Sequence, residues 1–265
     1  MQALCRARCG PRSGPAPARG SQPRCLAVRA TAAQQVAQAG GGAPAEHAAL
    51  DDAYNSQMAR QMGWSSPFEY HFDRGLYFHE VAPRLFCGTQ PRNPDELRQL
   101  AGAHRVDVIV NLQQDKDMEY WGIDWGANCA AMRELGLELV RHPAVDFDPH
   151  SLRKMLPGAV KEVAARLREG KRVYVHCTAG LGRAPAVCIA WLYWYGPHLS
   201  LDGAYGALTS IRPCGPKRDA IRGATFDVLD DRPFEAFDHL PQDAWAGLNE
   251  QDKARLQERI QAHWG

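Results

Sequence analysis

The stretch Val173–Pro185, VYVHCTAGLGRAP, decides the fold that we expect for this chain. It opens with a short apolar run, typical of a buried strand, and it continues into APAVCIAWLYWYG, which fits a buried helix. Cys177 stands at the end of the strand and Arg183 at the start of the helix, on either side of a loop with two glycines. This strand–loop–helix unit predicts a loop that bends around a tetrahedral anion.

The residues inside the loop indicate phosphate binding. Consecutive backbone N–H groups can point inward as a nest, and the N-terminus of the following helix adds positive potential. Glycines allow positive φ and close backbone approach. Arg183 supplies a planar fork of donors that matches two phosphate oxygens. The phosphate-binding loop is therefore expected to consist of Thr178, Ala179, Gly180, Leu181 and Gly182.

The same surroundings predict a reactive thiol at Cys177. A free thiol has a pKa of about 8.5, and helix N-termini and donor nests lower it to roughly 3.5–7.5. As a thiolate, Cys177 would be the nucleophile of a phosphocysteine mechanism. We expect His176 to orient the loop rather than to transfer protons. The alternative, a structural cysteine with Arg183 in a surface ion pair, is disfavoured by the spacing H-C-x5-R between a strand and a helix.

The rest of the chain alternates between the two kinds of secondary structure. Strands are expected at 76–81, 84–88, 106–112, 137–143 and 172–177, and helices at 51–62, 94–103, 127–135, 151–168, 185–195, 200–211, 217–229 and 249–263. Ser151 is expected to cap the helix that begins there. This alternation predicts an α/β fold, with a central, mostly parallel sheet flanked by helices on both faces and a helical C-terminal extension.

The N-terminal segment 1–45 differs in composition from the rest. It contains six arginines and no Asp or Glu, and it lacks the continuous apolar core of a secretory signal. This composition favours an organelle transit peptide with a linker, with a disordered basic tail as the alternative. We expect one domain over 46–231 and a helical extension over 232–265, packed on that domain.

Several classes of function are disfavoured by composition. Residues 46–265 hold 25 basic and 30 acidic residues, and this net negative charge argues against a general nucleic-acid binder. No apolar run reaches the ~18 residues that a membrane span needs. The five cysteines after residue 45 show no C-x-x-C spacing, so neither a zinc site nor a disulfide framework is suggested. We expect no metal and no cofactor, and a monomer by default.

At this point the chain resembles a known family. HCTAGLGR matches the H-C-x-x-G-x-x-R signature of the cysteine-dependent dual-specificity phosphatases. The resemblance implies a metal-independent enzyme whose general acid is a loop aspartate some 30 residues before the cysteine. The loop AVDFDP places Asp146 at 31 residues before Cys177. Asp148 is the competing candidate, and we favour a turn or cap role for it beside Pro149.

Aromatic residues suggest the substrate class. Flat aromatic faces suit the apolar faces of sugar rings. Five aromatic residues fall in loops or at loop edges: Phe68, Tyr70, Tyr120, Trp121 and Phe147. The alternative is that they are core residues, which we expect for Phe72 and Trp125. The loop interior has no basic residue besides Arg183, which disfavours a phosphoinositide substrate.

Three longer motifs narrow the resemblance: NLQQDKDMEYWGID (111–124), HCTAGLGRAPAV (176–187) and RPCGPKRDAIRGATFD (212–227). They are similar to those of the plant phosphoglucan phosphatases of the starch-excess group, most closely the Like Sex Four Two type. The resemblance implies hydrolysis of phosphate monoesters on glucose units of starch, at the C3 position for that type. It also implies phosphorylated starch glucan chains as partners and a chloroplast location, in the stroma or at the granule surface.

The resemblance carries over to individual glucan-binding positions. The five aromatic residues above match an aromatic channel beside the catalytic loop, with Phe68 where a tyrosine is usual. Trp245 and Asp252 match remote glucan sites. Departures from the family at Ala165, Glu138 and His142 predict that remote binding is weakened or lost.

Two alternative functions remain open. The first is a protein phosphatase acting on phospho-Ser, phospho-Thr or phospho-Tyr. The second is a non-catalytic phosphoglucan-binding scaffold, which should lack at least one of Cys177, Arg183 and Asp146, although all three are present. Ala184 stands where most relatives carry Ser or Thr, and the missing hydroxyl predicts slow breakdown of the phosphocysteine.

Overall fold

The computed structural model describes residues 44–62, 68–230, 240–241 and 243–263. Nearly all of the segment expected to be a transit peptide and linker, and part of the C-terminal extension, lie outside these ranges. The described residues all belong to one compact unit, Ala33–Gly265.

A five-stranded sheet with the order β1-β2-β5-β3-β4 lies at the centre of this unit. The strands are β1 (Phe78–Ala82), β2 (Leu85–Gly88), β3 (Val108–Asn111), β4 (Glu138–Arg141) and β5 (Val173–His176). β1 pairs antiparallel with β2, and the other pairings are parallel. The prediction of a mostly parallel sheet is confirmed.

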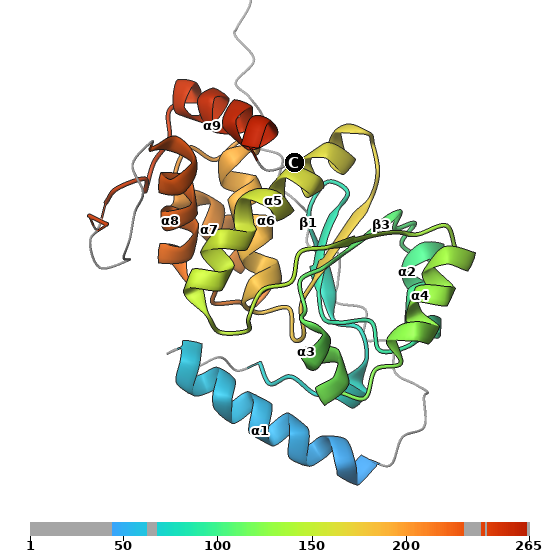
Figure 1. Ribbon diagram of the computed structural model, residues 1–265. Coiled ribbons are helices and arrows are strands. Elements are labelled where there is room, and N and C mark those ends of the chain that lie inside the picture. The colour runs from blue at the N-terminus through green and yellow to red at the C-terminus, as the bar shows by residue number, and fades with distance from the viewer. Residues whose placement is uncertain (1–43, 63–67, 231–239, 242, 264–265) are drawn as a thin grey trace, which may run out of the picture. The chain divides into compact units, whose positions relative to one another are not determined.

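Helices cover both faces of this sheet (Figure 1). One face carries α5 (Pro149–Arg168), α6 (Arg183–Trp194), α7 (Leu201–Thr209), α8 (Arg218–Leu229) and α9 (Glu250–His263). The other face carries α2 (Pro94–Gly102) and α4 (Trp125–Glu134). Side chains alternate along β5, so Val173 and Val175 join the larger core while Tyr174 joins the smaller one. The alternation sends His176 and Cys177 to opposite sides of the sheet.

The helix α5 begins earlier than its sequence suggests. The Asp148 carboxylate accepts hydrogen bonds from the backbone N–H groups of His150 at 2.8 Å and Ser151 at 3.1 Å, so Asp148 is the N-cap. The cap role preferred for Asp148 is confirmed, and the prediction that Ser151 caps this helix is wrong. Ser151 instead accepts the backbone N–H of Val145 at 2.9 Å, which fixes the preceding loop.

A short helix that we did not predict, α3 (Asp115–Tyr120), follows β3. Its six residues are too few for an apolar period to stand out in the sequence. Two hydrogen bonds close its first turn: Oδ2 of Asp117 accepts the backbone N–H of Gln114 at 3.0 Å, and the backbone carbonyl of Gln114 accepts the N–H of Asp117 at 3.1 Å.

The helix α1 (Pro44–Met62) lies beside α3, near the loops that follow the strands (Figure 1). Leu50, Tyr54 and Met58, spaced four residues apart, turn toward a small apolar cluster that includes Tyr70 and Trp121. Within the described ranges, no helix is both long and apolar enough to cross a membrane.

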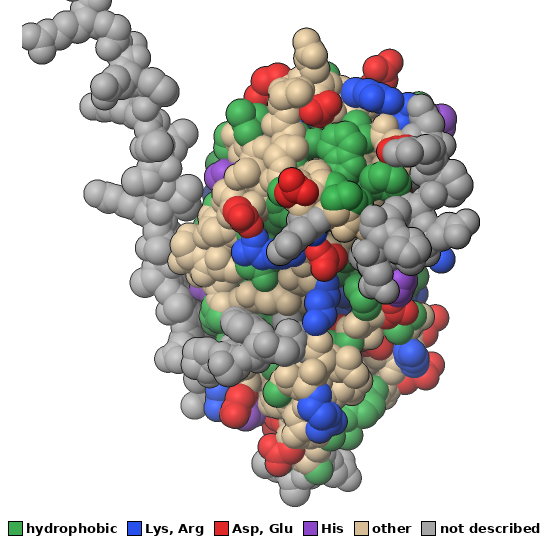
Figure 2. Space-filling model, turned by 90° about the vertical axis from the view of Figure 1, so that its left-hand side faces the viewer, with side chains coloured by type: hydrophobic (Ala, Val, Ile, Leu, Met, Phe, Trp, Pro, Cys, Tyr) green, Lys and Arg blue, Asp and Glu red, His purple; other side chains and the backbone are tan. Residues whose placement is uncertain are grey.

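The side of the molecule that carries α7 and α8 is shown in Figure 2. Among the described residues on this face, acidic and basic side chains are interspersed with apolar ones. The ion pairs Arg218–Asp202 and Arg222–Asp219 belong to these two helices.

Candidate active site

The loop between β5 and α6 has one position at which only glycine fits. Gly180 has φ +67°, and a Cβ atom built there would lie 2.5 Å from the carbonyl oxygen of Gly88. Gly182 has φ −115° and an open surrounding space, so neither positive φ nor close backbone approach requires glycine at this position. Gly182 is the N-cap of α6, whose first residue is Arg183.

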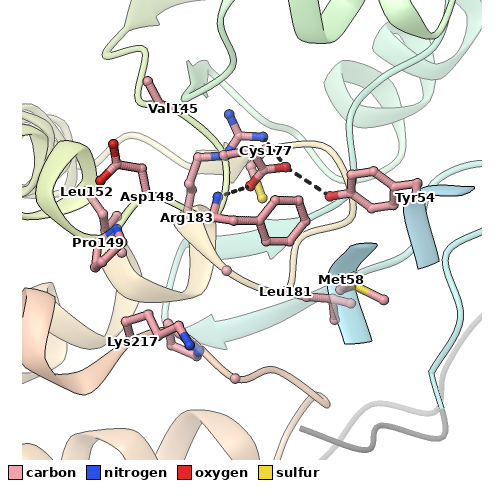
Figure 3. A pocket seen from close by; sticks show the side chains of 15 residues that line it. Tyr54, Met58, Val145, Asp148, Pro149, Leu152, Cys177, Leu181, Arg183 and Lys217 are labelled. Carbon is pink, nitrogen blue, oxygen red and sulfur yellow. Dashed lines mark hydrogen bonds and ion pairs between the residues drawn. The ribbon is translucent and has the colours of Figure 1, made fainter. Parts of the chain in front are cut away.

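Cys177 lies in an open cleft of about 490 Å³, including the solvent at its mouth. The cleft is lined by α1, the loop 145–148, the start of α5, the phosphate loop and the segment 215–217 before α8. Figure 3 shows Cys177, Arg183 and Tyr54 turned toward one another, with Leu181 and Lys217 along another side of the cleft. The thiol is buried but faces this opening, as a nucleophile requires.

Arg183 is 2% exposed and is bonded from several directions. Its guanidinium forms ion pairs with Asp117 at 2.6 Å and Asp146 at 3.0 Å. It also donates to the carbonyl of Ala144 at 2.9 Å and to the Thr178 hydroxyl at 3.3 Å. This burial contradicts the alternative of a surface ion pair, and it fixes the guanidinium beside the phosphate loop.

Asp146 occupies the cleft, whereas Asp148 points its carboxylate at the start of α5. Oδ2 of Asp146 contacts Arg183 and accepts the Tyr54 hydroxyl at 3.1 Å, and Oδ1 accepts the backbone N–H of Phe147 at 3.1 Å. Burial raises the pKa of Asp146, and the Arg183 charge opposes this rise while the Asp117 charge adds to it. A carboxyl with a raised pKa beside the nucleophile can donate a proton.

The Cys177 thiol does not have the low pKa that we expected. Burial raises its pKa, Arg183 opposes the rise, and the Asp146 carboxylate adds to it. The N–H of Ala184 hydrogen-bonds to the thiol and lowers its pKa. The main physical reason for the difference is burial of the thiol, and the Asp146 carboxylate beside it offsets part of the effect of the Arg183 charge.

His176 lies on the other side of the sheet from the cleft, beside a smaller cavity that Ile109 and Met118 also line. Its Nδ1 hydrogen-bonds to the carbonyl of Cys177 at 3.2 Å, so Nδ1 carries the proton. Burial lowers the pKa of His176 to about 4, and the hydrogen bond to Cys177 opposes this shift. A neutral imidazole on the far side of the strand holds the backbone and has no path to the cleft.

Tyr70 and Trp121 do not form the open aromatic channel that we predicted. Each is 2% exposed. Tyr54 packs edge-on against both rings, at 5.7 and 5.6 Å between centroids, and Phe72 stacks on Trp121 at 5.5 Å. In this arrangement their faces are covered by α1 and by Phe72, so these two rings do not line an open channel, and their contact with glucan stays a prediction. The apolar side of α1 packs against these rings, and this packing covers them.

The other three aromatic positions differ from one another. Tyr120 is 44% exposed. Phe147 is half-buried at the cleft, with φ +61°. Phe68 is half-buried and stacks on Tyr77 at 4.7 Å. Tyr120 and Phe147 therefore remain available to a ligand.

The predicted remote positions also have structural partners. Asp252 and Asn249 cap the start of α9 reciprocally, with hydrogen bonds of 3.4 and 2.8 Å. The backbone carbonyl of Trp245 accepts the Tyr193 hydroxyl at 2.9 Å. On β4, Glu138 forms ion pairs with Arg166 and Lys171.

Four residues of the site were missed by sequence reasoning. Tyr54 and Asp117 contact the catalytic groups directly, as described above. Gln113 donates to the Thr178 hydroxyl at 3.1 Å and to Gln90 at 2.7 Å, and Gln90 donates to the Tyr70 hydroxyl at 2.8 Å. The motif NLQQDKD contains two of the four, and polar residues after the apolar run 106–112 were the available signal. The described ranges contain no group of three or more His, Cys, Asp or Glu side chains arranged to hold a metal ion.

Comparisons with known proteins agree with this geometry. A family model described as the dual specificity phosphatase catalytic domain matches residues 86–221. "Phosphoglucan phosphatase DSP4, amyloplastic" from Castanea sativa is 35% identical over 67% of this chain and 47% of its own length. "Phosphoglucan phosphatase LSF1, chloroplastic" from Arabidopsis thaliana is 30% identical over 60% of this chain and 27% of its own. The chain thus spans less than two thirds of either relative.

Among solved structures, a crystal structure of Tk-PTP in its active form is 22% identical and covers 70% of this chain and 97% of that one, with a TM-score of 0.44.

Proposed function

The chain belongs to the dual specificity phosphatase family, and from this premise we propose that it is a phosphoglucan phosphatase. One observation carries the proposal: Cys177, Arg183 and Asp146 meet in one open cleft. The similarity to two proteins named as phosphoglucan phosphatases supports the choice of substrate. The family match covers about half of the chain, and the chain spans less than two thirds of either relative. The activity of the whole protein is therefore a proposal.

The proposed reaction has two steps. The Cys177 thiolate attacks phosphorus, a sulfur–phosphorus bond forms, and the bond to the sugar oxygen breaks. Asp146, protonated, gives its proton to that leaving oxygen. Asp146 then takes a proton from water, which attacks phosphorus and releases inorganic phosphate and the thiolate. Arg183 and the N–H groups of residues 178–182 hold the phosphoryl oxygens throughout.

Substrate binding would exchange one anion for another at Arg183. In the resting site the Asp146 carboxylate is paired with the guanidinium at 3.0 Å. A phosphate dianion offers two oxygens to the same fork of donors and would displace it. Displacement frees Asp146 to face the leaving oxygen, and it removes a nearby carboxylate that raises the pKa of Cys177.

Glucan contacts are proposed at the rings that a ligand can reach. Phe147 lines the cleft, Tyr120 is 44% exposed, and Phe68 is half-buried. Trp245 and Asp252 stay as proposed remote contacts. Preference for the C3 position is proposed from the family resemblance.

The location proposed for the protein is the plastid. The two relatives carry the words amyloplastic and chloroplastic in their names. The acid-free, arginine-containing segment 1–45 supports this location as a transit peptide with a linker. Within the plastid, we place the enzyme in the stroma or at the starch granule surface, as a monomer with a catalytic domain over 46–231 and an extension over 232–265.

The experiment that tests the function compares three substrates. Release of inorganic phosphate is measured from solubilised phosphorylated starch, from a phosphopeptide and from p-nitrophenyl phosphate. We expect turnover of starch and of the aryl phosphate, both lost in Cys177→Ser. Turnover of the peptide without turnover of starch would identify a protein phosphatase instead. This alternative remains open because Tyr70 and Trp121 are buried and do not form an open aromatic channel. Binding of starch without hydrolysis would identify a scaffold.

A further inference from the structure

We propose that Tyr54 is a positioning residue for the acid Asp146, which makes α1 a part of the catalytic site. The inference rests on the proposed phosphatase function, because it concerns the proton donor of that reaction. It assigns a role to a side chain 92 positions away in the chain, in a segment that the family model does not match.

The contact is direct and it lies inside the cleft. The Tyr54 hydroxyl donates to Oδ2 of Asp146 at 3.1 Å, and a dashed line in Figure 3 marks this bond. Tyr54 also lines the cleft together with Cys177. Burial raises the pKa of Tyr54, and the Asp146 charge raises it further, so the hydroxyl keeps its proton and remains a donor.

The tyrosine ring is held on several sides. It packs edge-on against Tyr70 and Trp121, and it lies against the Phe147 ring at 5.8 Å between centroids. A ring enclosed in this way has few alternative rotamers, so its hydroxyl has a defined position. Positioning of a second group requires this kind of rigid support.

The helix that carries Tyr54 is itself tied to the rest of the site. The Asn55 side chain bonds both backbone groups of Tyr70, each at 2.8 Å. The Asp51 carboxylate accepts the backbone N–H of Phe72 at 2.9 Å. These bonds, one turn apart on α1, fix the height of the helix over the cleft, and with it the position of the Tyr54 hydroxyl.

The chemistry explains why Asp146 needs this partner. In the resting site Oδ2 is held by both Arg183 and Tyr54. Once a phosphate binds the N–H groups of Arg183, the ion pair between Arg183 and Asp146 is lost. The Tyr54 hydroxyl then still holds the Asp146 carboxyl. Its hydrogen bond limits rotation of the group while the proton moves to the leaving oxygen. It also stabilises the carboxylate that remains after the transfer.

The inference predicts a dependence on the leaving group. A sugar alkoxide leaves only with a proton, whereas p-nitrophenolate leaves readily without one, so a misplaced acid affects the two substrates differently. In the full chain, Tyr54→Phe should lower kcat/KM on phosphorylated starch by about tenfold, the loss expected of one hydrogen bond to a charged group. On p-nitrophenyl phosphate the loss should stay below about threefold.

Two further measurements separate positioning from a structural role. The alkaline limb of the pH–rate profile on starch should move to higher pH in Tyr54→Phe, because the ionised form of Asp146 loses a donor. In an Asp146→Asn background, Tyr54→Phe should cause little additional loss on starch, because both changes act on one group.

A matched control variant completes the test. Tyr193→Phe removes a tyrosine hydroxyl that donates to a backbone carbonyl at 2.9 Å, and it should leave hydrolysis of the aryl phosphate unchanged. Equal losses on both substrates, an unmoved pH profile, or additive losses with Asp146→Asn would each overturn the inference. A wild-type protein with no activity on either substrate would overturn the proposed function instead.

Discussion

Arg183 and Asp146 form an ion pair at 3.0 Å inside the cleft, where the guanidinium that should hold the substrate phosphate already holds a carboxylate. Asp117 binds the other side of the same guanidinium at 2.6 Å. The resting site is therefore charge-compensated, and its proposed proton donor occupies part of the anion site. Oxyanion affinity, thiol reactivity and acid catalysis are linked through this one pair.

The first prediction concerns oxyanion binding. Asp146→Asn removes the internal competitor for Arg183, so the affinity for tungstate should rise by about tenfold, a small part of the Coulomb energy between close charges in a protein. Turnover of starch should fall by roughly 10²–10⁴-fold in the same variant, because the proton donor is gone. Isothermal titration calorimetry with tungstate measures the affinity.

Asp148→Asn is the control for this prediction. It removes a neighbouring charge that also lines the cleft, while asparagine caps a helix as well as aspartate does. An equal gain in tungstate affinity in both variants would mean that general charge, and not the pair with Arg183, sets the affinity.

The second prediction concerns the reactivity of Cys177. The Asp146 carboxylate contributes to the raised pKa of the thiol, so Asp146→Asn should lower that pKa. The rate of alkylation by iodoacetamide depends on the thiolate fraction, and its midpoint should therefore shift to lower pH. Mass spectrometry of the Cys177 peptide follows the reaction. A midpoint that stays in place or rises would contradict the coupling between the two groups.

The third prediction concerns stability at mildly acidic pH. His176 is buried with a pKa lowered to about 4, against about 6.5 in an unfolded chain. Between these two values the unfolded state binds the extra proton, so stability is full above pH 6.5 and is lost as the pH falls toward 4. From pH 7 to pH 5 the loss attributable to His176 is about 2 kcal/mol.

Urea unfolding at the two pH values measures this loss. His176→Gln should reduce the pH dependence by about that amount. Equal pH dependence in His176→Gln and the wild type would contradict the prediction.

The chemistry of the residues alone predicted the contiguous part of the site, whereas the prediction of Asp146 came from the family resemblance. The anion loop, Cys177 and Arg183 lie within seven positions, because a nest of N–H groups at a helix N-terminus is built from consecutive residues. The contact between Tyr54 and Asp146 spans 92 positions. The sequence predicted a helix over 51–62, but not the surface that it covers.

The same limit explains the error in the pKa of Cys177. The loop alone predicts a positive environment, and the helix terminus and Arg183 are present as expected. The pKa also depends on burial and on where a carboxylate from another loop comes to lie. The covering of Trp121 is a second case, because an aromatic residue at a loop edge fits a sugar and a helix equally well.

The fourth prediction separates core from surface among the aromatic residues. Trp121→Ala should cost about 3–5 kcal/mol of stability and should lower activity on starch and on aryl phosphate alike, because α1 loses the ring against which it packs. Tyr120→Ala changes the neighbouring, 44% exposed ring and should leave the melting temperature nearly unchanged while it weakens starch turnover. Thermal unfolding and kcat/KM on both substrates decide between them. A selective loss on starch in a stable Trp121→Ala would restore the glucan-binding role.

The fifth prediction concerns breakdown of the phosphocysteine. The N–H of Ala184 bonds to the Cys177 thiol at the start of α6, and the side chain that follows is a methyl group. In Ala184→Ser a hydroxyl beside the sulfur can stabilise the departing thiolate, so hydrolysis of the intermediate should accelerate by roughly threefold or more, a modest hydrogen-bond effect. Rapid-quench measurements with p-nitrophenyl phosphate should show a burst of product in the wild type and a smaller burst with a faster steady state in Ala184→Ser. Ala186→Ser, an equally buried site two residues further along α6, should retain the wild-type burst. A burst that is unchanged in Ala184→Ser would mean that the hydroxyl does not speed hydrolysis of the phosphocysteine. A wild type without a burst would mean that formation of the phosphocysteine, and not its hydrolysis, limits turnover.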